Sequence, residues 1–288
     1  MEEPMAHKNL HLDATQCGNT EFRWGERTYI MGIINMSRDS FSGDGFGSNI
    51  DKAIEQAKQF IAEGADIIDI GGESTRPGSQ PISPDDEIGR VVPIIEKLTA
   101  EINAPISIDT GKSAVAICAL QAGANMINDV WGMKLDNRLI GVASEAGVPL
   151  IITSNQRGQS CQQDIIKEVT IDLKRNINIA EKAGVKNRNI IIDPGIGFGK
   201  TLEQNLEIIR RLAELKSLNK PILLGTSRKS MIGLVLDLPA DRRLEGTAAT
   251  VAIGIANGAD IIRVHDVRQM ALVSRMSDAI IRRTKGEY

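Results

Sequence analysis

Donor and acceptor side chains recur in this sequence at the ends of short apolar runs. Asp109, Asn128 and Asp193 each end such a run, and Lys229 follows another. Carboxylates and an amide offer the acceptors and donors that suit a planar heterocycle with amino and ring N–H groups, and a lysine can donate to its carbonyl or ring nitrogen. An aspartate in this position can also simply cap the next helix. Taken together, the four residues predict a site for a polar heterocycle.

A second set of candidate residues is mainly cationic. Arg76, Arg263 and His265 lie at or after the ends of other apolar runs, and Asn35 ends the first run. Because guanidinium groups bind phosphate in a bidentate manner, this set predicts a phosphate or diphosphate on the ligand. Asn35 is also a candidate ligand for Mg2+, which takes few protein oxygens and shares phosphate oxygens. Each residue alone could be a solvated or structural side chain, so the prediction depends on the whole set.

Residues 193–200 form a glycine-rich segment, Asp-Pro-Gly-Ile-Gly-Phe-Gly-Lys. The segment does not match a nucleotide-phosphate loop, because Pro194 stands where the G-x-x-x-x-G-K-[ST] pattern requires its first glycine. Nor does it have the spacing of a dinucleotide-binding motif. We expect it to form a tight turn that presents Phe198 to a planar ligand.

The elements that carry these residues repeat along the chain from Tyr29. Short, almost wholly apolar runs alternate with longer segments whose apolar residues have helical spacing. The eight runs are Tyr29–Asn35, Asp66–Gly71, Pro105–Asp109, Met126–Asn128, Val148–Thr153, Asn189–Asp193, Pro221–Gly225 and Asp260–Val264. Runs that are apolar on both faces are typical of buried parallel strands. The pattern predicts an α/β fold, a (β/α)8 TIM barrel, with the polar residues at the carboxyl ends of its strands.

The segments between the runs are amphipathic and are expected to be helices. The clearest are Asp51–Glu63, Asp85–Ile102, Ile165–Ala183 and Leu202–Leu218. Several end on a glycine just before the next strand, where a left-handed residue stops the helix. Residues 29–288 are predicted to form one barrel domain. Residues 1–28 precede the first strand and are predicted to form a short extension that caps the barrel floor.

The composition favours a globular, cytoplasmic protein. The chain has 288 residues, of which 42% are hydrophobic, and 34 basic against 37 acidic residues give a net charge of −3. This near-balance gives no electrostatic basis for binding nucleic acid or an anionic membrane. The sequence has no run apolar enough to span a bilayer and no signal-peptide core at its start. Cys17, Cys118 and Cys161 are too far apart for a metal site, and their odd number suits a reducing cytoplasm.

Seven segments resemble the signature blocks of the dihydropteroate synthase family, whose members are pterin-binding TIM barrels. The segments are Met31–Phe41, Gly64–Gly78, Ser107–Thr110, Ile127–Val130, Asp193–Lys200, Gly225–Ser230 and Arg263–Val267. They occur in the family's order and extend over nearly the whole chain from Met31. A single block would be weak support, whereas seven in register are specific.

The resemblance implies a transferase of folate biosynthesis. The reaction condenses 6-hydroxymethyl-7,8-dihydropterin diphosphate with 4-aminobenzoate and gives 7,8-dihydropteroate and diphosphate. The residues implied for the pterin are Asp109, Asn128, Asp193 and Lys229, and those implied for diphosphate and Mg2+ are Asn35, Arg76, Arg263 and His265. Those implied for the aminobenzoate are Thr75, Pro77, Phe198, Ser227 and the stem of Lys229, and Gly225 completes the substrate-binding set.

In the implied mechanism, diphosphate leaves an exocyclic carbon conjugated with the pterin, and the aniline nitrogen then attacks this carbon. Mg2+ and the cationic residues stabilise the leaving group. The expected catalytic set is Asn35, Arg76, Asp109, Asp193, Lys229, Arg263 and His265. Ser227 has no nucleophilic role in this scheme, and a Ser-His-Asp site would lack its nucleophile elbow. Family members are commonly homodimers, and the apolar residues of Thr247–Ala256 and Met270–Ile281 permit one here.

The sequence departs from the family pattern in two loops. Ser37-Arg38 stands where the family usually has Thr-Pro, and Thr153-Ser154 stands where it usually has Met-His. Two alternatives share the same barrel and stay open at this point. One is a methyltransferase that moves a methyl group from methyltetrahydrofolate to a corrinoid, although that enzyme needs no cationic cluster for diphosphate. The other is a non-catalytic paralogue that binds a pterin.

Overall fold

The computed structural model describes residues 12–37, 49–75, 78–158 and 164–282. Within them, eight parallel strands form a barrel in the order β8-β7-β6-β5-β4-β3-β10-β9. Their bounds are β3 Tyr29–Asn35, β4 Ile67–Gly71, β5 Ile106–Asp109, β6 Met126–Asp129, β7 Leu150–Thr153, β8 Ile190–Asp193, β9 Leu223–Leu224 and β10 Ile261–Val264. A single parallel bridge between Ile192 and Ile222 joins β8 to the segment of β9 and closes the ring. The predicted barrel is therefore confirmed.

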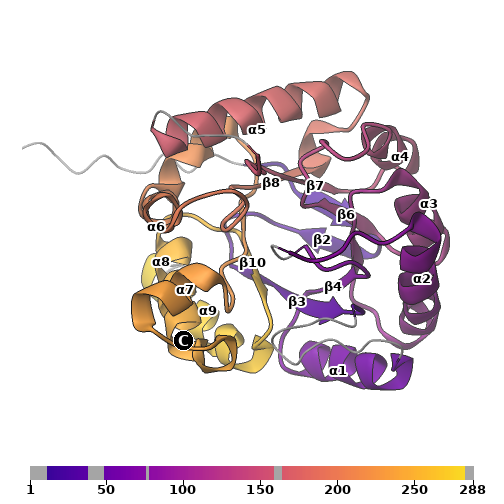
Figure 1. Ribbon diagram of the computed structural model, residues 1–288, viewed down its shortest axis with the longest axis horizontal. Helices are drawn as coiled ribbons and strands as arrows, with labels where there is room; N and C mark the ends of the chain where they lie inside the picture. Colours follow the sequence, from indigo (N-terminus) through magenta and orange to yellow (C-terminus); the bar gives the residue numbers. More distant parts are fainter. Residues whose placement is uncertain (1–11, 38–48, 76–77, 159–163, 283–288) are drawn as a thin grey trace, which may run out of the picture.

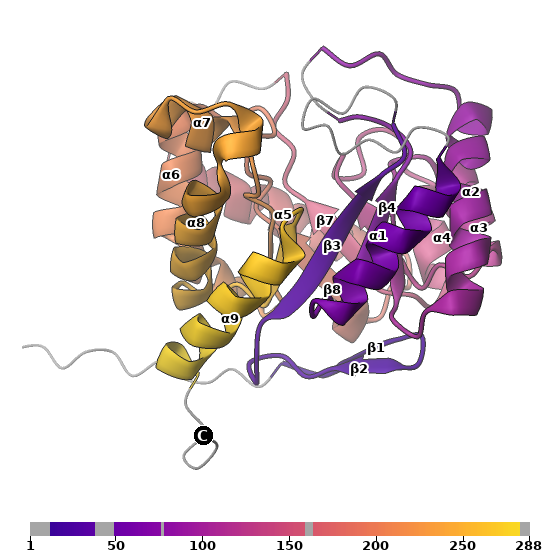
Figure 2. The ribbon, with the colours of Figure 1, turned by 90° about the horizontal axis from the view of Figure 1, so that it is seen from below.

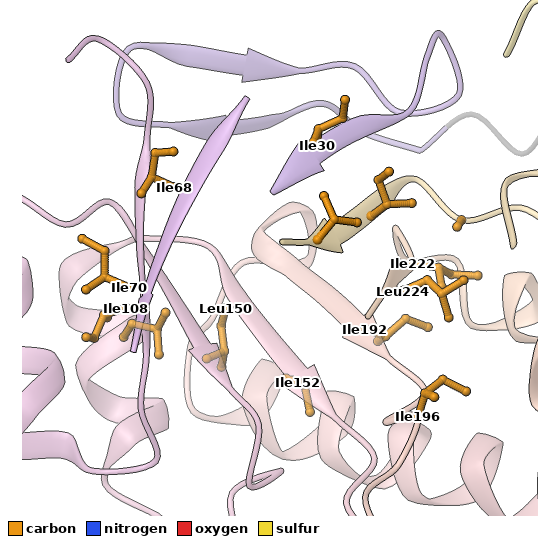
Figure 3. Close-up of a cluster of buried hydrophobic side chains, with 14 of the residues drawn as sticks. Ile30, Ile68, Ile70, Ile108, Leu150, Ile152, Ile192, Ile196, Ile222 and Leu224 are labelled. Carbon is orange, nitrogen blue, oxygen red and sulfur yellow. The ribbon is translucent and has the colours of Figure 1, made fainter. Parts of the chain in front are cut away.

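Both faces of the strands are buried, as their composition predicts. On most strands, alternate residues belong to two separate apolar clusters, as Ile67 and Ile68 of β4 do. The larger cluster lies between the strands and the helices that surround them, and Figure 3 shows part of it. The smaller cluster fills the lower part of the barrel with inward-facing residues, among them Met31 and Met126. Isoleucine suits these positions because a β-branched side chain packs well on a pleated surface.

A short hairpin closes the floor of the barrel. Its strands, β1 (Thr15–Cys17) and β2 (Thr20–Phe22), lie beneath the barrel at the end opposite to the tip of β3 (Figure 2). Phe22 packs edge-on against Tyr29 with ring centroids 4.8 Å apart, and it joins the inner apolar cluster. The described part of the extension, residues 12–28, thus covers the inner cluster from below. We propose that it acts as the cap expected for residues 1–28.

The helices form a ring around the strands (Figure 1). Their bounds are α1 Ile50–Ala62, α2 Pro84–Glu101, α3 Ser113–Gln121, α4 Leu139–Ala146, α5 Ile165–Lys182, α6 Leu202–Arg210, α7 Ser230–Leu236, α8 Leu244–Ala256 and α9 Val267–Ile281. Gly64, Gly123 and Gly258 have positive φ angles just after α1, α3 and α8, which confirms the predicted helix ends. Among the described helices, none is both long and apolar enough to cross a membrane.

One predicted helix is wrong in its extent. The segment Leu202–Leu218 is not a single α-helix, because α6 ends at Arg210 and a 3₁₀-helix follows over Leu212–Leu218. Leu212 and Leu215 are both buried, and their spacing of three matches the turn of a 3₁₀-helix. The side chain of Arg211 binds Asp164 with Nη1 at 2.9 Å at the junction. Two further 3₁₀-helices, Asn187–Asn189 and Ala240–Arg242, connect other elements.

Candidate active site

The strand register places several predicted site residues at one level of the barrel. Asn35 on β3 pairs with Gly71 on β4, Gly71 pairs with Asp109 on β5, and Asp109 pairs with Asn128 on β6. Farther around the barrel, Asp193 ends β8 opposite Thr153 of β7. The carboxyl ends of parallel strands lie at one end of a barrel, so these side chains border a common space above the core.

Arg263 on β10 joins two carboxylates across this space. Its Nε donates to Oδ2 of Asp69 at 2.6 Å, and its Nη2 donates to Oδ2 of Asp109 at 2.7 Å. Asn128 also donates to Oδ2 of Asp69, with an Nδ2–Oδ2 distance of 3.3 Å. Arg263 was assigned from sequence to the cationic set, yet its described contacts are with the carboxylates. The structure therefore connects the two predicted sets through one guanidinium.

The sequence reasoning missed Asp69. This aspartate lies within β4 and its side chain is fully buried. A signal was present, because Asp69 interrupts a run of isoleucines and a buried carboxylate requires a partner. Asp69 holds both Arg263 and Asn128, so it positions one residue of each predicted set.

The carboxylate cluster is prepared for a ligand that donates hydrogen bonds. Burial raises the pKa of Asp109 to about 7, although the charge of Arg263 opposes the shift. Burial would lower the pKa of Arg263, but Asp69 and Asp109 keep it above its usual value. Oδ1 of Asp69 and Oδ1 of Asn128 are buried and have no hydrogen-bond partner among the described residues. Unpaired buried acceptors are costly, so a bound ligand with N–H groups would satisfy them.

Asp193 and Lys229 form the other half of the polar space. Oδ1 of Asp193 accepts from the amide of Gly195 at 2.7 Å, and burial raises the pKa of this carboxyl despite the charge of Lys229. Lys229 Nζ donates to the carbonyl of Ile196 at 2.5 Å and lies 4.8 Å from the ring centroid of Phe198. Burial lowers the pKa of Lys229 to about 8. The ammonium thus lies over an aromatic ring and interacts electrostatically with the buried carboxylate of Asp193.

The glycine-rich loop after β8 forms tight turns, as predicted. Gly195 has a φ of 72°, and a Cβ at this position would lie 2.1 Å from the carbonyl oxygen of Ser154. The amide of Phe198 donates to the carbonyl of Gly195 at 3.1 Å. Lys200, which the sequence reasoning left without a role, donates to the carbonyls of Ser154 at 2.8 Å and Gly195 at 2.9 Å. This partly buried lysine fixes the loop that carries Phe198.

Ser227 and His265 lie together at the ends of β9 and β10. Ser227 Oγ is 3.0 Å from Nδ1 of His265, and it also accepts from the amide of His265 at 3.2 Å. Arg228 is held by Asp266, with an Nε–Oδ2 distance of 3.0 Å. A Cβ on Gly225 would lie 3.9 Å from both Cβ of Arg263 and Nζ of Lys229. Gly225 therefore leaves space between the two cations.

The loop after β4 is described only in part. Arg76 and Pro77 lie outside the described residues, so their predicted roles stay predictions. Thr75 is described, and its carbonyl accepts from Nη2 of Arg157. Arg38, noted as a departure from the family, also lies outside the described residues. Arg157 was not predicted as a site residue, although it follows Ser154 of the second departure by three positions.

The base of this loop is anchored by a buried ion cluster. Nζ of Lys112 lies 2.6 Å from Oε2 of Glu73 and 2.6 Å from Oε2 of Glu87. The same ammonium donates to the carbonyl of Ile82 at 3.0 Å. Lys112 thus ties Glu73, at the start of the loop, to Glu87 in the first turn of α2. Thr75 is not among the described partners of Lys112.

The chain is similar to known proteins over most of its length. A family model described as pterin binding enzyme matches residues 31–265. A relative named dihydropteroate synthase from Clostridium beijerinckii is 53% identical over 267 residues, which are 92% of this chain and 99% of the relative. The protein of that name from Bacillus subtilis is 48% identical over 273 residues, which are 94% of this chain and 95% of the relative.

Solved structures agree with these sequence relationships. Dihydropteroate synthase from Clostridium difficile, solved in the presence of pteroic acid, is 50% identical with a TM-score of 0.87, covering 91% of this chain and 100% of that one. The Xanthomonas albilineans enzyme with 4-aminobenzoic acid is 34% identical with a TM-score of 0.87, covering 93% and 98%. The likeness extends to the described barrel and to the segments that carry the candidate site.

Proposed function

The chain belongs to the dihydropteroate synthase family of pterin-binding enzymes, and we propose that its strand-end site performs the family's condensation with the residues described above. The enzyme is a transferase that joins a dihydropterin, supplied as its diphosphate, to 4-aminobenzoate. The single observation that carries the assignment of roles is the Arg263 bridge. It joins two carboxylates to one guanidinium, which supports neighbouring positions for the pterin and the diphosphate.

The pterin is proposed to bind against Asp109, Asn128 and Asp193. These residues present carboxylate and amide oxygens, one of which, Asn128 Oδ1, has no partner within the described part of the chain. The amino and ring N–H groups of a pterin are donors that match such acceptors. Lys229 adds a donor for the opposite edge of the ring. Because the site is buried, an unmatched ligand would leave charges unpaired, which favours a pterin over a plain aromatic ring.

The diphosphate is proposed to leave toward Arg263 and His265. Asp69 and Asp109 bind Nε and Nη2 of Arg263, so Nη1 is the group left for a phosphate oxygen. The bond from the exocyclic carbon to the diphosphate oxygen breaks, and positive charge develops on the carbon and the conjugated ring. The amine nitrogen of 4-aminobenzoate then forms a bond to this carbon and loses a proton. The fixed cations stabilise the departing charge without a covalent intermediate.

Asn35 is proposed to hold Mg2+ beside the diphosphate. A Cβ on Gly71 would lie 3.7 Å from Oδ1 of Asn35 and 3.7 Å from Oδ2 of Asp109, so the glycine leaves room beside two oxygen donors. Oxygen donors of this kind fit Mg2+, which commonly completes its shell with phosphate oxygens and water. When bound, the ion would neutralise charge on the leaving group. The described residues contain no group of three acidic, histidine or cysteine side chains that could hold a metal ion.

The aminobenzoate is proposed to bind on the side of Thr75, Phe198 and Ser227. Phe198 offers its ring, and Ser227 offers a hydroxyl close to the start of α7, where amide groups favour a carboxylate. The departure from the family after β7 is proposed to make the wall of the pterin pocket less apolar at Thr153. Thr153 is fully buried and its Oγ1 has no partner among the described residues, while Ser154 donates to Asp172 at 2.9 Å.

The chain is further proposed to form a homodimer in the cytoplasm. Leu272, Met276 and Ile280 are exposed at spacings of four along α9, and Ile253 is exposed on α8. A continuous apolar stripe of this kind suits a self-complementary contact between two copies. Cys17 and Cys118 are free thiols, and free thiols persist in a reducing compartment.

The reaction is tested by measuring diphosphate release by purified protein with Mg2+ and the dihydropterin diphosphate. Release is expected only when 4-aminobenzoate is also present, because the amine is the acceptor of the transferred group. Pterin binding without release would favour the non-catalytic paralogue. Transfer of a methyl group from methyltetrahydrofolate to a corrinoid would favour the methyltransferase.

A further inference from the structure

Arg157 brings together three loops at the mouth of the barrel. It lies four residues after the end of β7, and its Nη2 donates to the backbone carbonyl of Thr75 in the loop after β4. Its guanidinium carbon lies 4.8 Å from the ring centroid of Phe198 in the loop after β8. The same carbon lies 5.3 Å from the ring of Trp131, which follows β6. One side chain therefore contacts both Thr75 and Phe198, the two walls proposed for the aminobenzoate.

The backbone that carries Arg157 is fixed to the β8 loop. The amide of Gln156 donates to the carbonyl of Phe198 at 3.1 Å, and the amide of Arg157 donates to Oδ1 of Asn155 at 3.1 Å. The contact leaves no space for a side chain at Gly199, where a Cβ would lie 2.4 Å from the amide nitrogen of Arg157. The side chain of Arg157 therefore extends from a rigid base toward Thr75.

The charge of Arg157 is not neutralised by a carboxylate within the described ranges. Its described partners are a carbonyl and two aromatic rings, which suit a planar guanidinium because it can stack and donate in its plane. Lys229 lies 4.8 Å from the same Phe198 ring. Burial lowers the pKa of Lys229, and the charge of Arg157 contributes to that shift. A lysine in place of Arg157 would keep the charge but lose the planar stacking.

We propose that Arg157 is a positioning residue for the second substrate. It holds Thr75 and Phe198 at a fixed separation and so sets the width of the slot into which the aromatic amine enters. This inference rests on the proposed function, since it concerns the aminobenzoate side of the same site. It assigns a role to the segment after β7, where the sequence departs from the family pattern. The residue acts through Thr75 and Phe198, so its loss should impair binding of the amine and leave pterin binding intact.

The test compares Arg157→Gln and Arg157→Lys with the wild type in steady-state turnover. Arg138→Gln is the matched control, because Arg138 is an arginine whose side chain is 77% exposed and contacts Asp136. We expect Arg157→Gln to raise the KM for 4-aminobenzoate about tenfold and to change kcat little. The rise is expected because the variant loses a charge-assisted hydrogen bond to Thr75 and the stacking of the guanidinium on Phe198. Arg157→Lys should give an intermediate rise, and Arg138→Gln should match the wild type. The equilibrium affinity for the dihydropterin diphosphate should be unchanged in every variant, which also shows that each variant is folded.

A second amine separates positioning from direct contact with the carboxylate. 4-Aminobenzamide has the same ring and amine but no charge, so a residue that sets the slot width should affect both amines by a similar factor. A loss confined to 4-aminobenzoate would overturn the positioning role. An unchanged KM in Arg157→Gln, or an equal loss of pterin affinity, would also overturn it. Failure of the wild type to turn over 4-aminobenzoate would instead refute the proposed function.

Discussion

Asp69 and Arg263 form an ion pair inside the barrel, with Oδ2 of Asp69 2.6 Å from Nε of Arg263 although 194 positions separate them in the chain. Asp69 lies on β4 and Arg263 on β10, and β3 lies between these two strands in the barrel. This pair fixes the guanidinium that also binds Asp109. A single arginine of β10 is thus bound to carboxylates of both β4 and β5 within the candidate site.

Replacing Asp69 should therefore affect both stability and binding. Asp69→Asn leaves Arg263 buried with one carboxylate in place of two, and we expect the free energy of unfolding to fall by about 3 kcal/mol. Denaturant titration measures this change, and pterin affinity measured on the folded variant should fall as well. An unchanged unfolding midpoint together with unchanged pterin affinity would contradict the role given to Asp69.

Pterin affinity should depend on pH through Asp109. Burial raises the pKa of this carboxyl to about 7, and only the ionised form accepts hydrogen bonds with both oxygens. Affinity should therefore fall as the pH is lowered through about 7, which binding titrations across that range would show. Asp109→Asn should bind more weakly and lose this dependence. If the wild type binds equally well on both sides of pH 7, Asp109 does not contact the pterin as proposed.

Asp109 also makes the stability of the fold depend on pH, in the direction opposite to that of pterin affinity. Because its pKa is raised on folding, the folded protein holds this proton more tightly than the unfolded chain. The contribution of Asp109 to stability is therefore full below its unfolded pKa of about 4 and is lost as the pH rises through about 7. The ionised form that binds the pterin is thus the form that stabilises the fold less.

The β8 loop should not tolerate a side chain at Gly195. Gly195→Ala would combine a positive φ with a Cβ 2.1 Å from the carbonyl oxygen of Ser154, and we expect a loss on the order of 3 kcal/mol in unfolding free energy. Gly141→Ala is the matched control, because Gly141 lies in α4 with open space around it. That change should stabilise by about 0.5–1 kcal/mol, as alanine favours a helix. Equal thermal unfolding of the two variants would argue against a strained turn.

The apolar stripe on α9 should govern the oligomeric state. Leu272→Glu with Met276→Glu places charge on two side chains that are 62% and 63% exposed, so a dimer formed there should dissociate to monomers. Light scattering after size-exclusion chromatography measures the mass directly. Ile171→Glu is the control, because Ile171 on α5 is 66% exposed and lies outside the stripe. A wild-type monomer, or a double variant that stays dimeric, would refute this interface.

Most of the barrel could be predicted because its strands bury apolar residues on both faces. The run Tyr29–Asn35 matches β3 in full, whereas Pro221–Gly225 shortens to the two residues of β9. The hairpin of β1 and β2 was not predicted as strands, because each strand has only three residues and little periodicity. A local pattern indicates a long strand reliably but cannot show a pairing so short.

The site could be predicted where a residue stands at the end of a strand, as Asp109 and Asp193 do. Asp69 was missed because it lies inside a strand, and its role depends on a partner from β10. Arg157 and Lys200 were missed because they bind backbone carbonyls of other loops. Such acceptors belong to every residue, so they leave no pattern in the sequence.

The central claim is that buried aspartates hold a pterin at the strand ends, and Asp193→Asn tests it most directly. Isothermal titration of the dihydropterin diphosphate would compare this variant with the wild type and with Asp85→Asn, a change at an exposed position of α2. We predict that Asp193→Asn loses affinity by about a hundredfold or more, because a buried charge-assisted acceptor is lost, while Asp85→Asn binds as the wild type does. Wild-type affinity in a folded Asp193→Asn protein would contradict the proposed site.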